Sequence, residues 1–250
     1  MKIDKPATAQ HPQLKRLWMA CFGDTDAFVD RFFSVAFAPE RCLCMTEADQ
    51  VLAAAYWLDV SFQGKKAAYI YAVATDPAHR GNGHCRALMA AIHQVLGTTG
   101  YAGAMLVPGE PGLRQMYAKM GYADFGGIRE FACIAGQDPL PVTQISAAEY
   151  AALRRQYLPE TGVIQEGENL AFLRQFYRFY KTDEHILAAA STGCELFAAE
   201  LLGDSTAAPA ILAAFALHSG VFRVPGDTPF AMYHSLDGED GPEYFAFAFD

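Results

Sequence analysis

The chain has 250 residues, of which 52% are hydrophobic and 19% are charged, so it can form one large or two small domains with packed cores. Residues 141–250 carry the whole net charge of −9, with 6 basic and 15 acidic side chains, whereas residues 1–140 carry 13 of each. Nucleic-acid binding needs a basic footprint, so this balance excludes a nucleic acid as an expected partner and leaves a cationic acceptor such as an amine open.

The first half of the sequence predicts two helices followed by a sheet. Residues 11–21 and 26–37 have apolar side chains at helical spacing, and Asp24 or Thr25 would cap the second helix. Strands are predicted at 41–47, 51–62, 67–75 and 101–107, a helix after residue 83, a shorter helix near 111–120 and paired strands within 122–135. This order predicts an α/β (α+β) fold with a mixed, partly antiparallel sheet flanked by helices.

The segment Val73–Met89 contains the most informative motif. It has the pattern of a strand end, a glycine-containing loop and an amphipathic helix. Gly81 and Gly83 lie where the loop enters the helix, and glycine permits positive φ and a close approach of the backbone to a ligand. The first helical turn has N–H groups without intrahelical partners and a partial positive charge, so it favours a pyrophosphate. The Lys-Ser/Thr pair of a P-loop and the glycine spacing of a dinucleotide fingerprint are missing.

This loop resembles motif A of the GNAT superfamily of acyl-CoA N-acyltransferases. That motif runs Arg/Gln-x-x-Gly-x-Gly/Ala after a strand and a proline. Arg80, Gly83 and Cys85 take the three named places here, and Pro77 precedes them. Cys85 departs from the family pattern, in which Gly or Ala is usual, although its side chain is also small.

A second segment resembles motif B of the same family. Residues 106–125 read as a strand, a short helix and the pattern Tyr-x-x-x-Gly-Tyr/Phe, which Tyr117, Gly121 and Tyr122 fill. Gly121 would follow the end of the helix as its cap. Two motifs in the family's order and at its separation make the resemblance specific over roughly residues 1–135, the predicted acetyltransferase domain.

The resemblance implies an N-acetyltransferase that moves an acetyl group from acetyl-CoA to a primary amine of a small molecule or peptide, by direct attack in a ternary complex. It implies two catalytic roles: the N–H of Val73 would polarise the thioester carbonyl, and Tyr117 would protonate the leaving thiolate. The residues implied in binding acetyl-CoA are Val73, Ala74, Thr75, Arg80, Gly81, Asn82, Gly83, His84, Cys85 and Arg86.

The general base stays open in the sequence. An acceptor ammonium is mostly protonated at neutral pH, so its proton must be removed before attack. Candidates in the strands before the glycine loop are Glu47, Asp59 and Tyr71, and a water relay is an equal alternative. The carboxylate of Asp250 is a further candidate, since multidomain relatives can use a chain terminus in the site.

A linker rich in Pro and Gly is predicted at 136–145, followed by a second GNAT-like domain at 146–250. Helices are predicted at 146–157, 166–181 and 209–218, and strands at 185–191, 195–202, 221–224, 230–236 and 244–249, with residues 237–241 turning the last two strands into a hairpin. The loop after Leu202 reads GDSTAAPA and lacks the paired glycines, so this degenerate tandem copy is expected to hold no acyl-CoA.

Two other functions remain open. One is a non-catalytic module that binds acyl-CoA, and the other is aminoacyl or peptidyl transfer as in some tandem GNAT-like proteins, which the acidic C-terminal part disfavours. The six cysteines show no metal-ligand spacing, so no metal is expected. No signal peptide or bilayer-length apolar run is evident, which predicts a cytoplasmic protein, monomeric or homodimeric, without a membrane partner.

Overall fold

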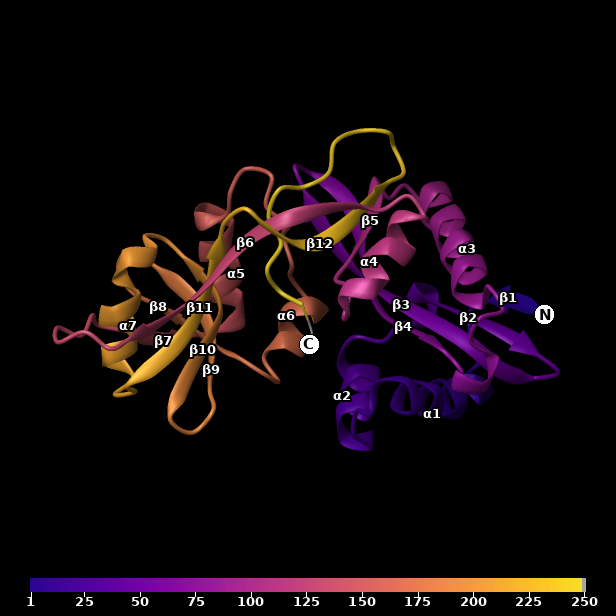
Figure 1. Ribbon diagram of the computed structural model, residues 1–250, viewed down its shortest axis with the longest axis horizontal. Coiled ribbons are helices and arrows are strands. Elements are labelled where there is room, and N and C mark those ends of the chain that lie inside the picture. Colours follow the sequence, from indigo (N-terminus) through magenta and orange to yellow (C-terminus); the bar gives the residue numbers. More distant parts are fainter. Residues whose placement is uncertain (249–250) are drawn as a thin grey trace. The chain divides into compact units, whose positions relative to one another are not determined.

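The computed structural model describes residues 1–248, which divide into two compact units (Figure 1). The first unit contains residues 1–123 and 232–241, and the second contains residues 124–231 and the chain from residue 242 onward. The fold is mixed α/β, with mostly antiparallel strands flanked by helices, as predicted. The predicted domain boundaries at 135 and 146 concern folding units and stay a prediction.

The first unit takes most of its elements from the N-terminal half of the chain. They are β1 (Lys2–Asp4), α1 (His11–Phe22), α2 (Asp26–Val35), β2 (Cys42–Glu47), β3 (Gln50–Phe62), β4 (Lys65–Thr75), α3 (His84–Thr98), β5 (Gly103–Leu106) and α4 (Pro111–Ala118). The strand order is β1-β2-β3-β4-β5-β12, where β12 (Thr228–Ser235) contributes Met232–Ser235. Only β4 and β5 are parallel; every other neighbouring pair is antiparallel.

Helices cover both faces of the first sheet (Figure 1). On one face, Leu88, Met89 and Ile92 of α3 pack with buried strand residues such as Trp57 and Ile70. On the other face, an aromatic cluster joins α1, α2 and the strands; it comprises Trp18, Phe32, Tyr56 and Tyr71, with ring centroids 4.7–5.6 Å apart in the closest pairs. Alternation along β3 and β4 therefore feeds two cores, one on each side.

The second unit repeats this arrangement. Its elements are β6 (Ala123–Ile134), β7 (Thr143–Ile145), α5 (Ala147–Tyr157), α6 (Glu168–Leu173), β8 (Arg178–Lys181), β9 (Ile186–Ser191), β10 (Glu195–Leu202), α7 (Ala208–Ala214) and β11 (Ser219–Pro225). The strand order is β7-β8-β9-β10-β11-β6, and only β10 and β11 are parallel. Short 3₁₀ turns occur at Thr8–Gln10, Pro39–Arg41, Pro77–His79 and Ser205–Ala207.

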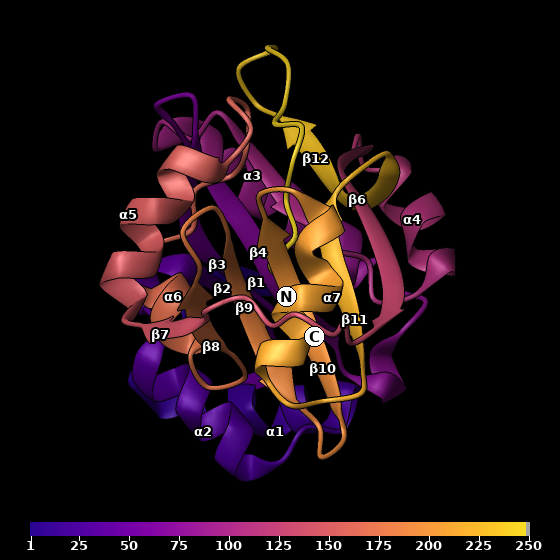
Figure 2. The ribbon, with the colours of Figure 1, turned by 90° about the vertical axis from the view of Figure 1, so that its left-hand side faces the viewer.

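One face of the second sheet is covered by α7, which lies in front of β10 and β11 in Figure 2. Ile211 and Leu212 pack there with Leu187 and Phe222. A buried polar network lies beside β10: Glu200, fully buried, accepts hydrogen bonds from Arg154, Tyr150 and Tyr244. Every oxygen of this carboxylate has a donor, which a buried charge requires.

Several predicted elements differ from the structure. The helix predicted at 166–181 ends at Leu173, because Phe179 leaves the helix to pair in β8 and stack on Tyr150 at 4.4 Å. The strands predicted as a pair within 122–135 form the single strand β6. β1, β7 and β8 were not predicted as strands; the first two have only three residues each, too few for a periodic pattern.

The predicted C-terminal hairpin is also wrong. β12 pairs with β5, joining Met232 to Leu106 and Ser235 to Gly103, so its partner lies far back in the sequence. Within the described residues, Tyr244 makes a parallel bridge to Gly162 instead of a strand pair with β12. The rest of the predicted strand 244–249 reaches residue 249, which with Asp250 lies outside the described residues.

Among residues 1–248, no helix has both the length and the apolar character that crossing a membrane requires.

Candidate active site

An irregularity near the end of β4 opens the pairing of the first sheet. Ala72 and Val73 together face the single residue Ala55 on β3, which is a β-bulge, and Ala72 has φ +50°. β4 pairs with its parallel neighbour β5 only through Ala67–Tyr69. A bulge leaves its extra residue out of the ladder, so backbone groups near Val73 are available to a bound ligand.

The last three residues of β4 are those predicted to lie beside the pantetheine arm and the thioester. Val73 packs against the core on the α3 side, and Ala74 is buried. The carbonyl oxygen of Thr75 accepts hydrogen bonds from Cys21 Sγ and from Arg80 Nε, both at 3.3 Å. These bonds hold the strand end between α1 and the loop that follows.

The loop from β4 to α3 contains both predicted glycines in the conformation that requires glycine. Gly81 and Gly83 have φ +81° and +78°. A Cβ atom at either position would meet no neighbour within 4 Å, so backbone conformation rather than crowding favours glycine here. Asp76 accepts the N–H of Ala78 at 2.8 Å and fixes the start of the loop.

The N-terminus of α3 follows directly from Gly83. This 15-residue helix has no side-chain hydrogen bond at its cap. The amides of His84, Cys85 and Arg86 belong to the first turn, where no preceding carbonyl accepts them. Asn82 and Arg86 are exposed, and Asn82 Nδ2 donates to the carbonyl of His79 at 3.2 Å. An accessible first turn with uncapped amides is a site for an anion.

Tyr117 lies in α4 and is buried, with 6% of its surface exposed. It belongs to the same core cluster that Val73 and Cys85 pack against, so three predicted site residues come together. Burial raises the pKa of the Tyr117 hydroxyl well above its ordinary value, and the Cys85 thiol adds to the rise. The phenol therefore keeps its proton at neutral pH, as a general acid must before it reacts.

A chain of aromatic contacts lies behind Tyr117. Its ring meets Tyr122 edge-on at 5.7 Å, and the Tyr122 hydroxyl is 2.8 Å from His93 Nε2. His93 stacks on His234 at 4.1 Å, and His234 Nδ1 donates to the Gly121 carbonyl at 3.0 Å. Gly121 has φ +90°, as expected after a helix end, although the last helical residue is Ala118.

The predicted base candidates are separated by the structure. Asp59 accepts from Tyr101 at 2.5 Å and pairs with Lys66 at 3.3 Å, near the opposite end of β3 from Ala53, the residue that faces Thr75. Glu47 is exposed at the β2–β3 turn. Tyr71 is on β4 itself, just before the bulge, and the candidate Asp250 lies outside the described residues.

Sequence reasoning missed the aromatic side chains beside the strand end. Trp18 of α1 packs on Tyr71 at 5.4 Å and on Phe22 at 6.0 Å, and its indole N–H donates to Asp24 at 2.8 Å. Phe22 is 47% exposed. Helical periodicity marks Trp18 as a core residue, and only the Cys21–Thr75 hydrogen bond shows that this end of α1 lies at the end of β4.

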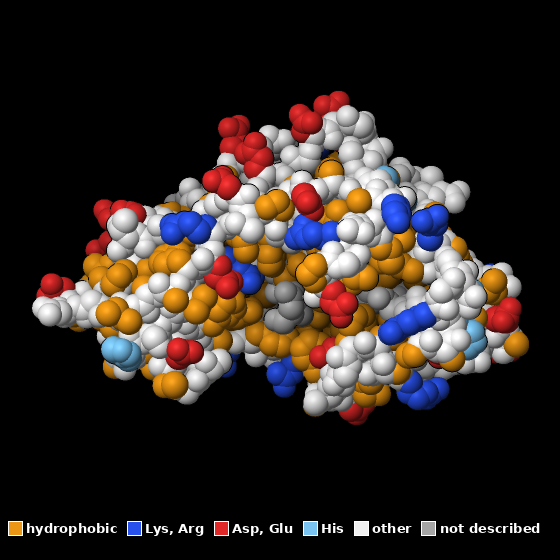
Figure 3. All heavy atoms as spheres, in the orientation of Figure 1, with side chains coloured by type: hydrophobic (Ala, Val, Ile, Leu, Met, Phe, Trp, Pro, Cys, Tyr) orange, Lys and Arg blue, Asp and Glu red, His pale blue; other side chains and the backbone are white. Residues whose placement is uncertain are grey.

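Within residues 1–248, no group of three or more His, Cys, Asp or Glu side chains is placed to hold a metal ion. The acidic excess is visible in Figure 3, where carboxylates gather on the loop after β12. Asp237, Glu239 and Asp240 are exposed there, and Asp237 pairs with Lys65 at 3.2 Å.

Comparison with protein families places the first unit. Residues 2–124 match the family described as the acetyltransferase (GNAT) domain. This range contains β1 to α4 and every residue predicted from the glycine loop and from Tyr117. No protein of curated function matches the sequence significantly.

Solved structures resemble both units of the chain. A GCN5-related N-acetyltransferase from Anabaena variabilis superimposes with a TM-score of 0.78 at 16% identity, over 94% of this chain and 72% of that one. One from Kribbella flavida gives 0.73 at 18% identity, over 94% and 71%. A probable N-acyltransferase from Enterococcus faecalis gives 0.71 at 17%, over 94% and 73%. At these identities the likeness concerns the fold.

Proposed function

Because residues 2–124 belong to the GNAT acetyltransferase family, we propose that this protein transfers an acetyl group from acetyl-CoA to a primary amine of a small molecule or peptide. The amine attacks the thioester carbonyl directly while both substrates are bound. The C–N bond forms as the C–S bond breaks, and coenzyme A leaves as a thiolate that takes up a proton. Holding both reactants in line supplies much of the acceleration.

The donor site is proposed at the bulge of β4 and the start of α3. The pantetheine arm lies where β4 and β5 have stopped pairing, beyond Tyr69, and the N–H of Val73 donates to the thioester oxygen. The pyrophosphate lies on the amides from Gly81 to Arg86, and Arg80 adds positive charge. The positive φ of both loop glycines and the uncapped α3 terminus support this assignment.

Tyr117 is proposed as the general acid. Its pKa is raised by burial, so its hydroxyl stays protonated until the thiolate forms. It packs with Val73 and Cys85 against one core cluster, so the acid is near both ends of the pantetheine path. The other proposed functions need no such acid: a module that only binds acyl-CoA would be indifferent to the loss of this hydroxyl.

The acceptor is proposed to approach from the α1 side of the strand end. Trp18, Tyr71 and the exposed Phe22 offer an aromatic wall there, and Asp24 supplies a carboxylate that attracts an ammonium group. The proton lost by the amine passes to water on this side, because Asp59 is committed to Tyr101 and Lys66 at the other end of β3. Aromatic rings also attract cations, which suits an amine acceptor.

The single observation that carries the proposal is the joint occurrence of the β4 bulge and the glycine loop on one strand–helix unit. A thiol-release assay with acetyl-CoA tests it against a panel of polyamines, amino acids and peptides. We expect release that depends on an amine and an acetylated product of matching mass. Binding of acetyl-CoA without release in any amine would favour the non-catalytic module.

A further inference from the structure

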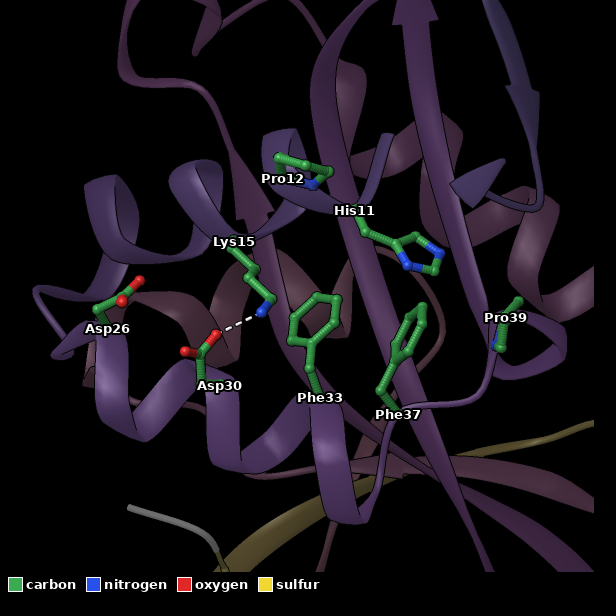
Figure 4. A pocket seen from close by; sticks show the side chains of 8 residues that line it. All are labelled: His11, Pro12, Lys15, Asp26, Asp30, Phe33, Phe37 and Pro39. Carbon is green, nitrogen blue, oxygen red and sulfur yellow. Dashed lines mark hydrogen bonds and ion pairs between the residues drawn. The ribbon is translucent and has the colours of Figure 1, made fainter. Parts of the chain in front are cut away.

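A pocket of about 580 Å³ opens between α1 and α2, and it contains none of the residues assigned to acetyl transfer. Figure 4 shows its walls, which come from the start of α1, the length of α2 and the turn at Pro39. The eight lining residues are His11, Pro12, Lys15, Asp26, Asp30, Phe33, Phe37 and Pro39. Its volume lies within the range of sites for small organic molecules.

Aromatic rings form one wall of this pocket. Phe33 and Phe37 stack with ring centroids 4.5 Å apart, and the His11 ring meets Phe37 edge-on at 5.0 Å. Both phenylalanines remain partly exposed. His11 Nε2 is a buried atom without a hydrogen-bond partner among the described residues. The wall therefore offers a flat apolar face and one polar atom at its edge.

The charged groups of the pocket favour a cation. Asp26 and Asp30 are four residues apart on α2 and so lie on the same helical face, against the single ammonium of Lys15. That ammonium pairs with Asp30 and lies 5.2 Å above the ring of Phe33 (Figure 4). Lys15 thus demonstrates the position of a cation between carboxylate and ring, and Asp26 leaves one negative charge over.

We propose that this pocket is a second ligand site, which binds a small organic cation with an apolar body. The cationic head lies near Asp26 and over the phenylalanine rings, and the body rests on Phe33 and Phe37. The proposal is independent of acetyl transfer, because the site shares no residue with the donor site or with the acceptor wall at Phe22.

Benzyltrimethylammonium is a suitable probe, because a quaternary nitrogen has no proton to lose and cannot be acetylated. Calorimetry or NMR titration of the full chain should give saturable binding with a Kd of about 0.1–1 mM. Binding should weaken at high salt and should be the same with saturating acetyl-CoA. Benzyl alcohol, which has the ring without the charge, should bind more weakly.

Substitutions of opposite sign make the test specific. Asp26→Asn should weaken binding about two- to fivefold by removing a carboxylate, and Phe33→Leu about threefold by removing a ring. Lys15→Met should tighten binding about two- to fivefold, because it removes a competing ammonium and frees Asp30. Asp138→Asn removes the same charge from the linker and should change nothing. Thermal melts confirm that each variant is folded.

Saturable binding with this pattern supports the pocket as a cation site. Absence of saturable binding overturns the proposal, as does a Lys15→Met variant that binds more weakly than the wild type. Binding that is lost in Phe22→Ala and unchanged in Phe33→Leu would assign the cation to the acceptor wall and would equally overturn it.

Discussion

The two units share one strand plan but differ where the first would hold its cofactor. In each, five strands and a sixth from elsewhere in the chain follow one order of directions, with a single parallel pair: β4 with β5, and β10 with β11. Each parallel pair is crossed by a helix, α3 or α7. The sixth strands are exchanged along the chain, since β12 pairs with β5 and β6 pairs with β11.

The loops between strand and helix separate the units. After β4, Gly81 and Gly83 turn the backbone through positive φ into a 15-residue helix with an uncapped start. After β10, Asp204 caps its own turn by accepting from Thr206 at 2.9 Å, and the helix that follows has 7 residues. A carboxylate at this position repels phosphate, so the second loop is unsuited to the ligand that the first loop fits.

The strands also differ beyond the parallel pairing. β10 has a register shift between Ala198 and Glu200, as β4 has near Val73. In the second unit that place holds the buried Glu200, bonded to Arg154, Tyr150 and Tyr244. In the first unit it holds a half-buried Val73 near a protonated Tyr117. The same backbone irregularity is therefore closed by an ion pair in one unit and left for a ligand in the other.

Gly83→Asp should have the largest effect, because it places a side chain and a negative charge where the pyrophosphate is proposed. Acetyl-CoA should raise the melting temperature of the wild type by mass action and leave that of the variant unchanged. Gly193→Asp is the matched control, since Gly193 has φ +77° and lies in the β9–β10 turn of the second unit. It carries the same backbone strain but should keep the acetyl-CoA shift. Equal shifts in both variants would remove the loop from the site.

Tyr117→Phe tests the chemistry separately from binding. The variant keeps the ring that packs on Tyr122 and loses only the hydroxyl. Turnover should fall by roughly 10²–10⁴-fold in the thiol-release assay, while the acetyl-CoA shift stays nearly intact. Tyr122→Phe, which loses a hydroxyl bonded to His93, is the comparison variant and should retain most of the turnover. Wild-type turnover in Tyr117→Phe would leave this residue as part of the core.

The first unit was predictable from its sequence because local signals act there. Helical spacing gave α1 and α2, Thr25 caps α2 by accepting from Phe28 at 3.3 Å, and the glycine loop lies between β4 and α3 as expected. The exchange of β12 was not predictable, because its pairing with β5 joins residues more than a hundred positions apart. The β4 bulge was missed for a related reason, since Ala72 adopts φ +50° without being a glycine.

Residues of mixed character caused the remaining errors in the second unit. The segment from Phe176 to Tyr180 has apolar residues that fit a helix as well as a strand, and packing of Phe179 on Tyr150 decides for the strand. The buried Glu200 gave no signal, because a single carboxylate in an alanine-rich strand is usually a surface residue.

Glu200→Gln should destabilise the second unit without touching acetyl-CoA. Removing the charge leaves the buried Arg154 guanidinium without its partner, which typically costs about 3–5 kcal/mol. Chemical denaturation should therefore shift to lower denaturant, while the acetyl-CoA-induced change in melting temperature persists. Loss of that ligand effect in the folded variant would mean that the second unit takes part in cofactor binding.

The smallest expected effect is a response to acid confined to the first unit. Burial, with the neighbouring His234 as a second cause, lowers the pKa of His93 to about 4, below its ordinary 6.5. The unfolded chain therefore binds more protons than the folded one between these values, so stability should fall as the pH drops from 6.5 towards 4. Hydrogen exchange at pH 5 and pH 7 should show α3 and β12 losing more protection than α7. His93→Gln should reduce that difference, and equal losses in all three elements would contradict the assignment.

The stoichiometry and position of acetyl-CoA test the central claim most directly. A crystal grown or soaked with acetyl-CoA should contain one ligand per chain, with its thioester at Val73–Thr75 and its pyrophosphate on the amides from Gly81 to Arg86. Calorimetry on the same protein should give one site. Two equivalent sites, or a second ligand beside Gly203 and the start of α7, would contradict the account of one unit that binds the cofactor and one that has closed the corresponding place.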